Sequence, residues 1–441
     1  MPDFSIYRNS VRNLNRNMRF FLATAFFVCL AQAVDIVLLN LYLKNVGFSN
    51  TQLGEIESMR FLASMILSVP CGLLSDRLGR RKTMLLSITL CSLAHGLRAV
   101  LLSQTALMAA TFLQGGSYTL LFITIPPFIA EQVAEEHRGT IFSLFFASFT
   151  GVGIIGYMLG GVLPDLLHGM GSVLVHSQRL TLLLGAGIFS IALLPTVFIR
   201  EQERGVGVAS AADEIGARLN ENTVNEFPQI DGVDPASVTD KQSAIGFLET
   251  MRRLPAAERR AIISFTIPEI FSGIGSALIV PLMTVFFSSQ YQMSSSTIGV
   301  VEAAGELSII VATFLGPFVM QRFGIVKAIA MFQLASAPFL LLMGNAPLLP
   351  LALVGYLVRG ALMNSLSPLK STLQMQRVSA AYRGFAASCA EVGFSLSRTI
   401  FASIGGRFSE SYGFPALYSF ASIFYIASGV LYFLLNREKA A

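Results

Sequence analysis

Charged residues are scarce in this chain. Asp, Glu, Lys and Arg together make up 13% of its 441 residues, whereas 53% are hydrophobic. A water-soluble globular protein carries about 25% charged residues, and the mean hydropathy of this chain is +0.64. The composition excludes an ordinary water-soluble globule and indicates an integral membrane protein.

Residue types and motifs on which other protein classes depend are also missing or rare. Tryptophan is absent, so aromatic contacts at a membrane surface fall to Tyr and Phe. The four cysteines, Cys29, Cys71, Cys91 and Cys389, all lie in or at the ends of apolar runs, which excludes a disulfide framework. The sequence contains no nucleotide-binding loop, metal-ligand spacing or nucleophile elbow. We therefore expect no enzyme, no cofactor and no metal site.

Long apolar runs dominate what is present. A helix needs roughly 20 apolar residues to cross a hydrocarbon core of about 30 Å. The runs are continuous rather than alternating, which predicts helices rather than a barrel. Twelve spans are predicted, at residues 19–43, 51–75, 82–103, 105–132, 139–166, 177–199, 260–288, 296–320, 327–347, 350–376, 384–407 and 414–435.

The cations are distributed unequally between the two sides of these spans. The side that holds the N-terminus receives the cluster at 77–82 and most other Lys and Arg, whereas the opposite side receives only Lys44, Arg179 and Arg407. Cytoplasmic loops carry the excess of cations. We therefore expect a multi-pass protein of the cell membrane with both termini in the cytoplasm. The net charge of +5 is a topology signal, and no nucleic-acid surface is expected.

The chain repeats itself at an offset of 245 residues. Without gaps, this shift places Glu57 on Glu302, Gly79 on Gly324, and the pair 160–161 on 405–406. Matching charges and glycines at one constant offset predict a duplicated six-helix unit. The domains expected are an N-terminal bundle at 1–199, a cytoplasmic linker at 200–259 and a C-terminal bundle at 260–441. The linker is polar, and we expect it to be a tether, although a regulatory role is the alternative.

The loop between the second and third spans carries a recognisable motif. It reads Gly72-Leu-Leu-Ser-Asp-Arg-Leu-Gly-Arg-Arg-Lys82, which resembles the loop motif of the major facilitator superfamily of secondary transporters. The resemblance implies an all-α fold of two six-helix bundles related by a pseudo-two-fold axis, with a substrate site between them. It also implies that the loop forms a cytoplasmic latch between the halves. The alternative is a purely topogenic role, in which its cations only orient the protein in the membrane. The latch residues are Gly72, Asp76, Arg77, Gly79, Arg80, Glu131 and Arg138.

Several charged residues lie inside the predicted spans, where each costs on the order of 3 kcal/mol or more. Internal ion pairing within each bundle is one explanation for them. The alternative is proton coupling. Within the predicted spans, each half holds one more acidic residue than basic residues, and burial raises the pKa of a carboxyl that no cation compensates, so that it can take up a proton. The charge network expected comprises Glu57, Arg60, Arg98, Glu302, Glu306 and Arg398.

The resemblance also selects cavity residues, because the first, fourth, seventh and tenth helices line the central cavity in that superfamily. It implies a substrate cavity formed by Asp35, Gln114, Tyr118, Glu269, Arg359 and Asn364. Asp35 and Glu269 are the leading proton or cation sites, with a hydrogen-bonded structural acid as the alternative. Arg359 either binds an anionic substrate group or neutralises Glu306, and we favour neutralisation.

Two stretches resemble motifs of the drug/proton antiporter branch, each with one departure. In 156–161, Tyr157 stands where the antiporter motif has proline, and Thr111 replaces the arginine of the motif that precedes Gly115. We predict a proton-coupled exporter of a small organic solute that works as a monomer in the lipid bilayer. The alternatives are an importer or facilitator of an ionisable polar metabolite, and a membrane receptor or scaffold that transports nothing.

Overall fold

A computed structural model describes residues 14–133, 135–200, 254–313, 316–379 and 382–436. Every regular element in this part of the chain is a helix, and eleven of them are long and apolar enough to cross a membrane. The expected linker falls almost wholly on 201–253, and the two chain ends on 1–13 and 437–441. These segments lie outside the described residues.

The first half contains six membrane-length helices, which correspond to the first six predicted spans. They are α2 (Arg16–Val46), α3 (Asn50–Leu78), α4 (Arg80–Val100), α5 (Gln104–Gln132), α6 (Glu135–Gly169) and α7 (Leu174–Ile191), followed by the short α8 (Leu193–Val197).

The second half repeats this order with more interruptions. Its elements are α12 (Ala256–Ile279), η2 (Val280–Leu282), α13 (Met283–Tyr291), α14 (Ser295–Thr313), α15 (Gly316–Phe323), α16 (Ile325–Asn345), α17 (Leu349–Asn364), α18 (Leu366–Arg377) and α19 (Arg383–Asn436). The last two predicted spans form the single element α19, which bends at Gly413, where the φ angle of 79° interrupts the helix. Each of the twelve predicted spans is thus mainly helical in the part of the chain that the structure describes.

The backbone itself records the duplication. The tight turn between α3 and α4 has Gly79 at φ 83° and ψ 159°, and the turn before α16 has Gly324 at φ 80° and ψ 158°. Both values of φ lie in the left-handed region that only glycine adopts without strain. The same rare conformation at positions 245 residues apart confirms the internal repeat.

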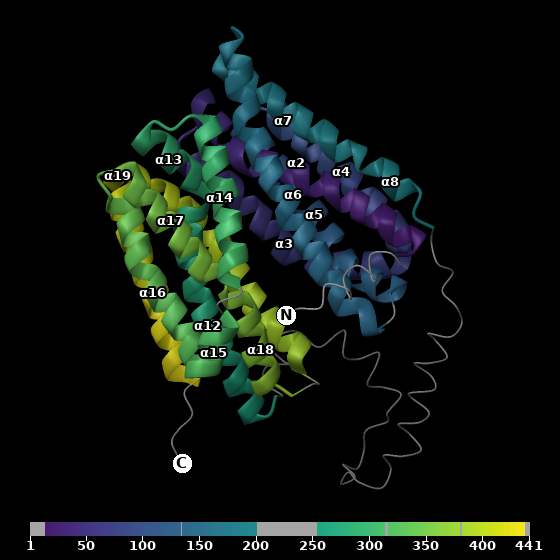
Figure 1. The fold of residues 1–441 in the computed structure, drawn as a ribbon, viewed down its shortest axis with the longest axis vertical. Coiled ribbons are helices and arrows are strands. Elements are labelled where there is room, and N and C mark those ends of the chain that lie inside the picture. The colour runs from purple at the N-terminus through teal and green to yellow at the C-terminus, as the bar shows by residue number, and fades with distance from the viewer. Residues whose placement is uncertain (1–13, 134, 201–253, 314–315, 380–381, 437–441) are drawn as a thin grey trace. The chain divides into compact units, whose positions relative to one another are not determined.

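Glycine also permits the two halves to approach each other (Figure 1). Helix α3 packs on the first part of α19, and α6 packs on α14. A Cβ atom on Gly54 would meet the carbonyl of Ala402, and one on Gly299 would meet the carbonyl of Tyr157. Both contacts belong to the repeat, since each pair is the other shifted by 245 residues. Small residues at such crossings are the usual means of close helix packing in membranes.

One side of the molecule is closed by contacts between the halves. We call it the Gly47 face, because the turn at Gly47 lies there, and we call the opposite side the Gly79 face. On the Gly47 face, the Asp165 carboxylate accepts a hydrogen bond from the Ser296 N–H at 2.8 Å, and Glu410 accepts one from the Thr51 N–H at 3.1 Å. These two contacts are again related by the 245-residue shift. Each carboxylate lies at the N-terminus of a helix in the other half.

The outer surface is strongly apolar. Leu93, Leu194, Ile423 and Val311 are among many large hydrophobic side chains that are more than half exposed. Burying an apolar surface contributes about 25 cal/mol per Å², so a surface of this kind is stable only against lipid. The fold is that of a multi-pass membrane protein.

Candidate functional site

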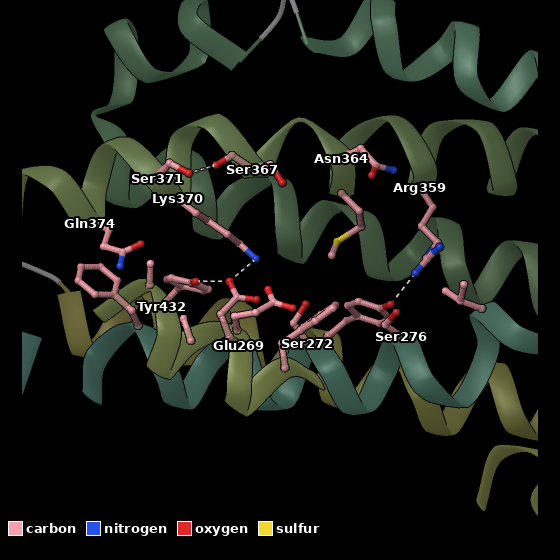
Figure 2. Close-up of a pocket in the computed structure, with 18 residues that line it drawn as sticks. Glu269, Ser272, Ser276, Arg359, Asn364, Ser367, Lys370, Ser371, Gln374 and Tyr432 are labelled. Atoms are coloured by element: carbon pink, nitrogen blue, oxygen red, sulfur yellow. Dashed lines mark hydrogen bonds and ion pairs between the residues drawn. The ribbon is translucent and has the colours of Figure 1, made fainter. Parts of the chain in front are cut away.

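A cavity of about 430 Å³ lies within the C-terminal half (Figure 2). Its walls come from α12, α17, α18 and α19. The lining is mixed, with serines, two tyrosines and two phenylalanines beside four charged side chains, Glu269, Arg359, Lys370 and Glu391. A polar, charged cavity between membrane helices is where an ionisable solute would bind.

Glu269 and Lys370 form an ion pair in the middle of this cavity. The Lys370 Nζ atom lies 2.6 Å from Glu269 Oε1, and the Tyr432 hydroxyl donates to the same oxygen at 2.5 Å. The ammonium group also lies 5.2 Å from the centre of the Tyr432 ring. Three helices thus contribute to one carboxylate, which gives it a fixed position in the wall.

Arg359 lies at another point of the cavity wall. Its guanidinium donates to the Tyr425 hydroxyl at 2.6 Å and lies 5.0 Å from the centre of that ring. Asn364 follows at the end of α17, where Ser365 separates α17 from α18, and its side chain bonds back to the Gly360 carbonyl. Figure 2 shows Arg359 and Ser276 toward one end of the cavity, and Glu269 and Lys370 nearer the middle.

The other three residues expected in the cavity lie elsewhere. Asp35, Gln114 and Tyr118 are buried within the N-terminal half and do not line the cavity described above. Asp35 Oδ2 accepts from Arg98 at 2.9 Å, and the Gln114 amide lies 3.5 Å from the same oxygen. The structure therefore brings Glu269, Arg359 and Asn364 together and separates them from the other three.

Arg98 links two acids in that N-terminal cluster. Besides Asp35 it contacts Glu57 at 3.3 Å, and Glu57 in turn pairs with Arg60 at 2.8 Å. His95 Nδ1 donates to the Cys91 carbonyl at 2.7 Å, and its Nε2 atom lies 3.9 Å from Asp35 Oδ2. Arg98 is 1% exposed, and the two acids that it links are also buried, whereas the Arg60 side chain is 31% exposed.

The acids of α14 are arranged differently from the ion pairing considered above. Glu302 accepts from the Tyr356 hydroxyl at 2.8 Å, and Glu306 accepts from Tyr157 at 3.2 Å. No ion pair joins either acid to a cation among the described residues. Arg359 therefore does not neutralise Glu306, contrary to our expectation, because its guanidinium faces Tyr425 instead.

Arg398, the remaining member of the expected network, stacks against aromatic rings. Its guanidinium carbon lies 3.8 Å from the centre of the Phe61 ring, across the interface between the halves. Among the described residues it forms no ion pair, and its Nε atom is buried without a hydrogen-bond partner.

The residues of the expected latch lie within the N-terminal half. Arg80 pairs with Asp76 at 2.8 Å and with Glu131 at 2.9 Å, while Gly79 supplies the turn. Gly72 and Arg77 lie in the last two turns of α3. Arg138 belongs to α6, but its side chain lies outside the described ones. These contacts hold α3, α4 and α5 together at the Gly79 face.

Lys370, Tyr425 and Tyr432 are among the cavity residues that the sequence-based set did not include. Lys370 carried a signal, because it is a cation within an apolar span and could have been paired with Glu269 on that ground. Tyr425 and Tyr432 carried no such signal, because the sequence does not show whether an aromatic residue in an apolar helix faces lipid or a cavity.

Comparison with known proteins identifies the family of this chain. The sequence profile of the Major Facilitator Superfamily matches residues 20–268 and 269–441. The chain belongs to the Major Facilitator Superfamily. The resemblance drawn from the loop at 72–82 is thereby confirmed, and so is the fold of two six-helix bundles.

Individual relatives are distant and match partial lengths. The quinolone resistance protein NorA of Staphylococcus aureus is 26% identical over 145 residues, which cover 33% of this chain and 37% of that protein. The D-xylose-proton symporter-like 3 of Arabidopsis thaliana is 26% identical over 162 residues, 36% of this chain and 29% of that protein. The chain thus aligns with about a third of the length of these relatives.

Solved structures match over nearly the whole chain. A bacterial homolog of the human lysosomal transporter Spinster, inward-facing and occupied, has a TM-score of 0.73 and 14% identity, and covers 99% of both chains. The nucleoside transporter NupG has a TM-score of 0.71 and 14% identity, and covers 96% of this chain and 100% of that one. At this identity the likeness concerns the fold.

Proposed function

We propose that this transporter exports a small ionisable organic solute by alternating access, in exchange for protons. The observation that carries the proposal is the charged cavity of the C-terminal half, in which the Glu269–Lys370 pair faces the space open to solute. The match to a quinolone resistance protein supports export of an organic ion.

Glu269 is the proposed proton site. Its carboxylate is held by Lys370 and Tyr432, and protonation would release Lys370 from the ion pair. A charged solute group that displaces Lys370 would also break this ion pair. Proton and solute would therefore compete for the Glu269–Lys370 pair. Asp35, paired with Arg98 in the other half, is proposed as a second site that responds when the halves move.

The Gly79 face is proposed to be cytoplasmic, because the cations of 77–82 lie there. The state described is then closed to the outside by the contacts of the Gly47 face. In this proposal the Asp76–Arg80–Glu131 network joins the C-terminal half only after the Gly79 face has closed, and so acts as a latch of the opposite state.

The test uses purified protein in liposomes with an imposed pH gradient. A quinolone, a nucleoside and D-xylose are offered in turn, and proton flux and solute flux are both recorded. We expect flux with the organic ion, coupled to protons in the opposite direction. Absence of both fluxes with every solute would leave a receptor or scaffold as the better description.

Variants of the ion pair separate coupling from structure. E269Q should abolish proton flux, and K370M should leave an unpaired acid and impair folding. The double variant E269Q/K370M restores neutrality, so we expect normal stability without coupling. If the double variant still couples solute to protons, Glu269 is not the proton site.

Import is the second candidate. It is favoured by the match to a proton symporter and by the charges of the cavity, which suit a polar metabolite. The same liposomes distinguish the two, since a symporter moves solute and proton in one direction and an antiporter moves them in opposite directions.

A further inference from the structure

Arg359 is a buried cation without a counterion. The residue is 7% exposed, and its guanidinium contacts the Tyr425 hydroxyl and ring. Its Nε atom is buried and has no hydrogen-bond partner. Within the described chain, no carboxylate lies within ion-pairing distance of this side chain. A buried guanidinium in this condition is costly, which indicates a role beyond packing.

The acids of the cavity and of helix α14, which packs against α17, have other hydrogen-bond partners. Glu269 is bound by Lys370 and Tyr432, and Glu391 accepts from Ser395 at 3.0 Å. On the facing helix α14, Glu302 and Glu306 are bound by tyrosine hydroxyls. Among the described residues, none of these acids forms an ion pair with Arg359.

The position of Arg359 suits a ligand rather than a structural partner. The side chain belongs to the cavity wall, beside Ser276 and Asn364, and Tyr425 holds one edge of the guanidinium in place (Figure 2). A guanidinium presents a rigid fork of N–H donors that matches the two oxygens of a carboxylate or phosphate. Tyr425 and Phe394 add aromatic surface for an organic group.

We propose that Arg359 binds an anionic group of the transported solute, a carboxylate or a phosphate, and thereby defines the substrate class as organic anions or zwitterions. The inference rests on the proposed function, because it assigns the solute to the same cavity. The organic part of the solute lies along Tyr425 and Phe394, toward the Glu269–Lys370 pair.

The experiment measures binding at equilibrium and needs no flux. Purified protein is melted with benzoate, phenyl phosphate and inorganic phosphate, and with benzamide as the neutral match for benzoate, at constant ionic strength. We expect the anions to raise the melting temperature and benzamide to have no effect. In R359Q the affinity for the anions should fall about 10- to 100-fold, the loss of charge-assisted hydrogen bonds. R359K should show an intermediate loss.

Two controls separate recognition from structure. R407Q removes an exposed guanidinium that pairs with Glu55 and does not line the cavity, so its response to the anions should match that of the unmodified protein. Without ligand, R359Q should melt no lower than the unmodified protein, because the lost cation had no counterion. Y425F should weaken anion binding, because it frees the guanidinium that the hydroxyl orients.

Two results would overturn the inference. One is an unmodified protein that no anion stabilises, and the other is R359Q with an unchanged response. Neither depends on transport: binding without flux would refute the proposed function and leave the anion site standing. Conversely, proton-coupled flux of neutral solutes without anion binding would refute the inference alone.

Discussion

The paired carboxylates of the Gly47 face offer a direct test of how the two halves of this protein close on each other. Asp165 at the end of α6 accepts the N–H of Ser296, the second residue of α14, and Glu410 in α19 accepts the N–H and hydroxyl of Thr51 at the start of α3. Both acids bind a helix N-terminus of the other half. We predict that D165A/E410A weakens the closed state of this face.

The magnitude follows from helix capping. An acidic acceptor at a helix N-terminus contributes about 0.5–2 kcal/mol through its hydrogen bond and its interaction with the helix dipole. Glu410 is exposed and Asp165 partly so, and solvent screening places each near about 1 kcal/mol. Because the two sites share no partner, their effects should add. Together they amount to about 2 kcal/mol, a factor of about 30 in the ratio of closed to open molecules.

Spin labels on the two halves can measure this ratio. Met170 and Tyr412 are 73% and 70% exposed on the Gly47 face, one in each half, and the four native cysteines are buried. With cysteines at both positions, the long-distance fraction between labels should rise in D165A and E410A, and most in the double variant. N345A serves as the control, because the Asn345 side chain contacts only its own half.

Two outcomes would refute this reasoning. If the labelled D165A/E410A variant gives the same distance distribution as the labelled protein with both carboxylates intact, the carboxylates do not hold the face closed. If N345A shifts the distribution as much as the double variant, the effect is a general loosening of the face. The long-distance fraction of D165N should lie between those of the unmodified protein and D165A, since asparagine keeps a hydrogen-bond acceptor and loses the charge.

Three further predictions concern the interior and the opposite face. R98M should lower the free energy of unfolding by about 3–5 kcal/mol, because it leaves Asp35 and Glu57 buried without their shared cation; denaturation in detergent measures this. G299V should shift the same spin-label distances toward separation, because its side chain would meet the backbone of α6, and unchanged distances would contradict the close approach. Asp76→Asn should alter crosslinking between the halves at the Gly79 face, and an identical crosslinking pattern would exclude the latch.

Much of the fold could be read from the sequence because a bilayer constrains it so strongly. Continuous apolar runs can only be helices there, and the turn at Gly79 together with its counterpart at Gly324 revealed the repeat. The interruptions of the second half were harder to place. The short η2 segment at 280–282 forms where Pro281 breaks the helix and the Asn40 side chain from the other half donates to the Pro281 carbonyl at 2.7 Å.

The candidate site was only partly predictable, because the sequence shows which charged residues lie in apolar helices but not which residues they contact. Glu269 and Arg359 stood out as ionisable residues in apolar helices, yet Tyr425 and Tyr432, which hold them, did not. Asp35 and Glu269 stood out alike as acids in the first helix of each half, but Asp35 pairs with Arg98 in the interior of its half. Only the packing of neighbouring helices distinguishes these two acids.

The sequence by itself determined the class of protein, the number of its spans and its duplication, because hydropathy and a constant offset are properties of the chain alone. The tertiary structure decided which charges meet. The rotation of each helix about its axis sets whether a side chain faces a partner, a cavity or lipid, and that rotation depends on contacts between residues far apart in sequence. Arg359 shows the difference, since only the structure reveals that no carboxylate among the described residues pairs with it.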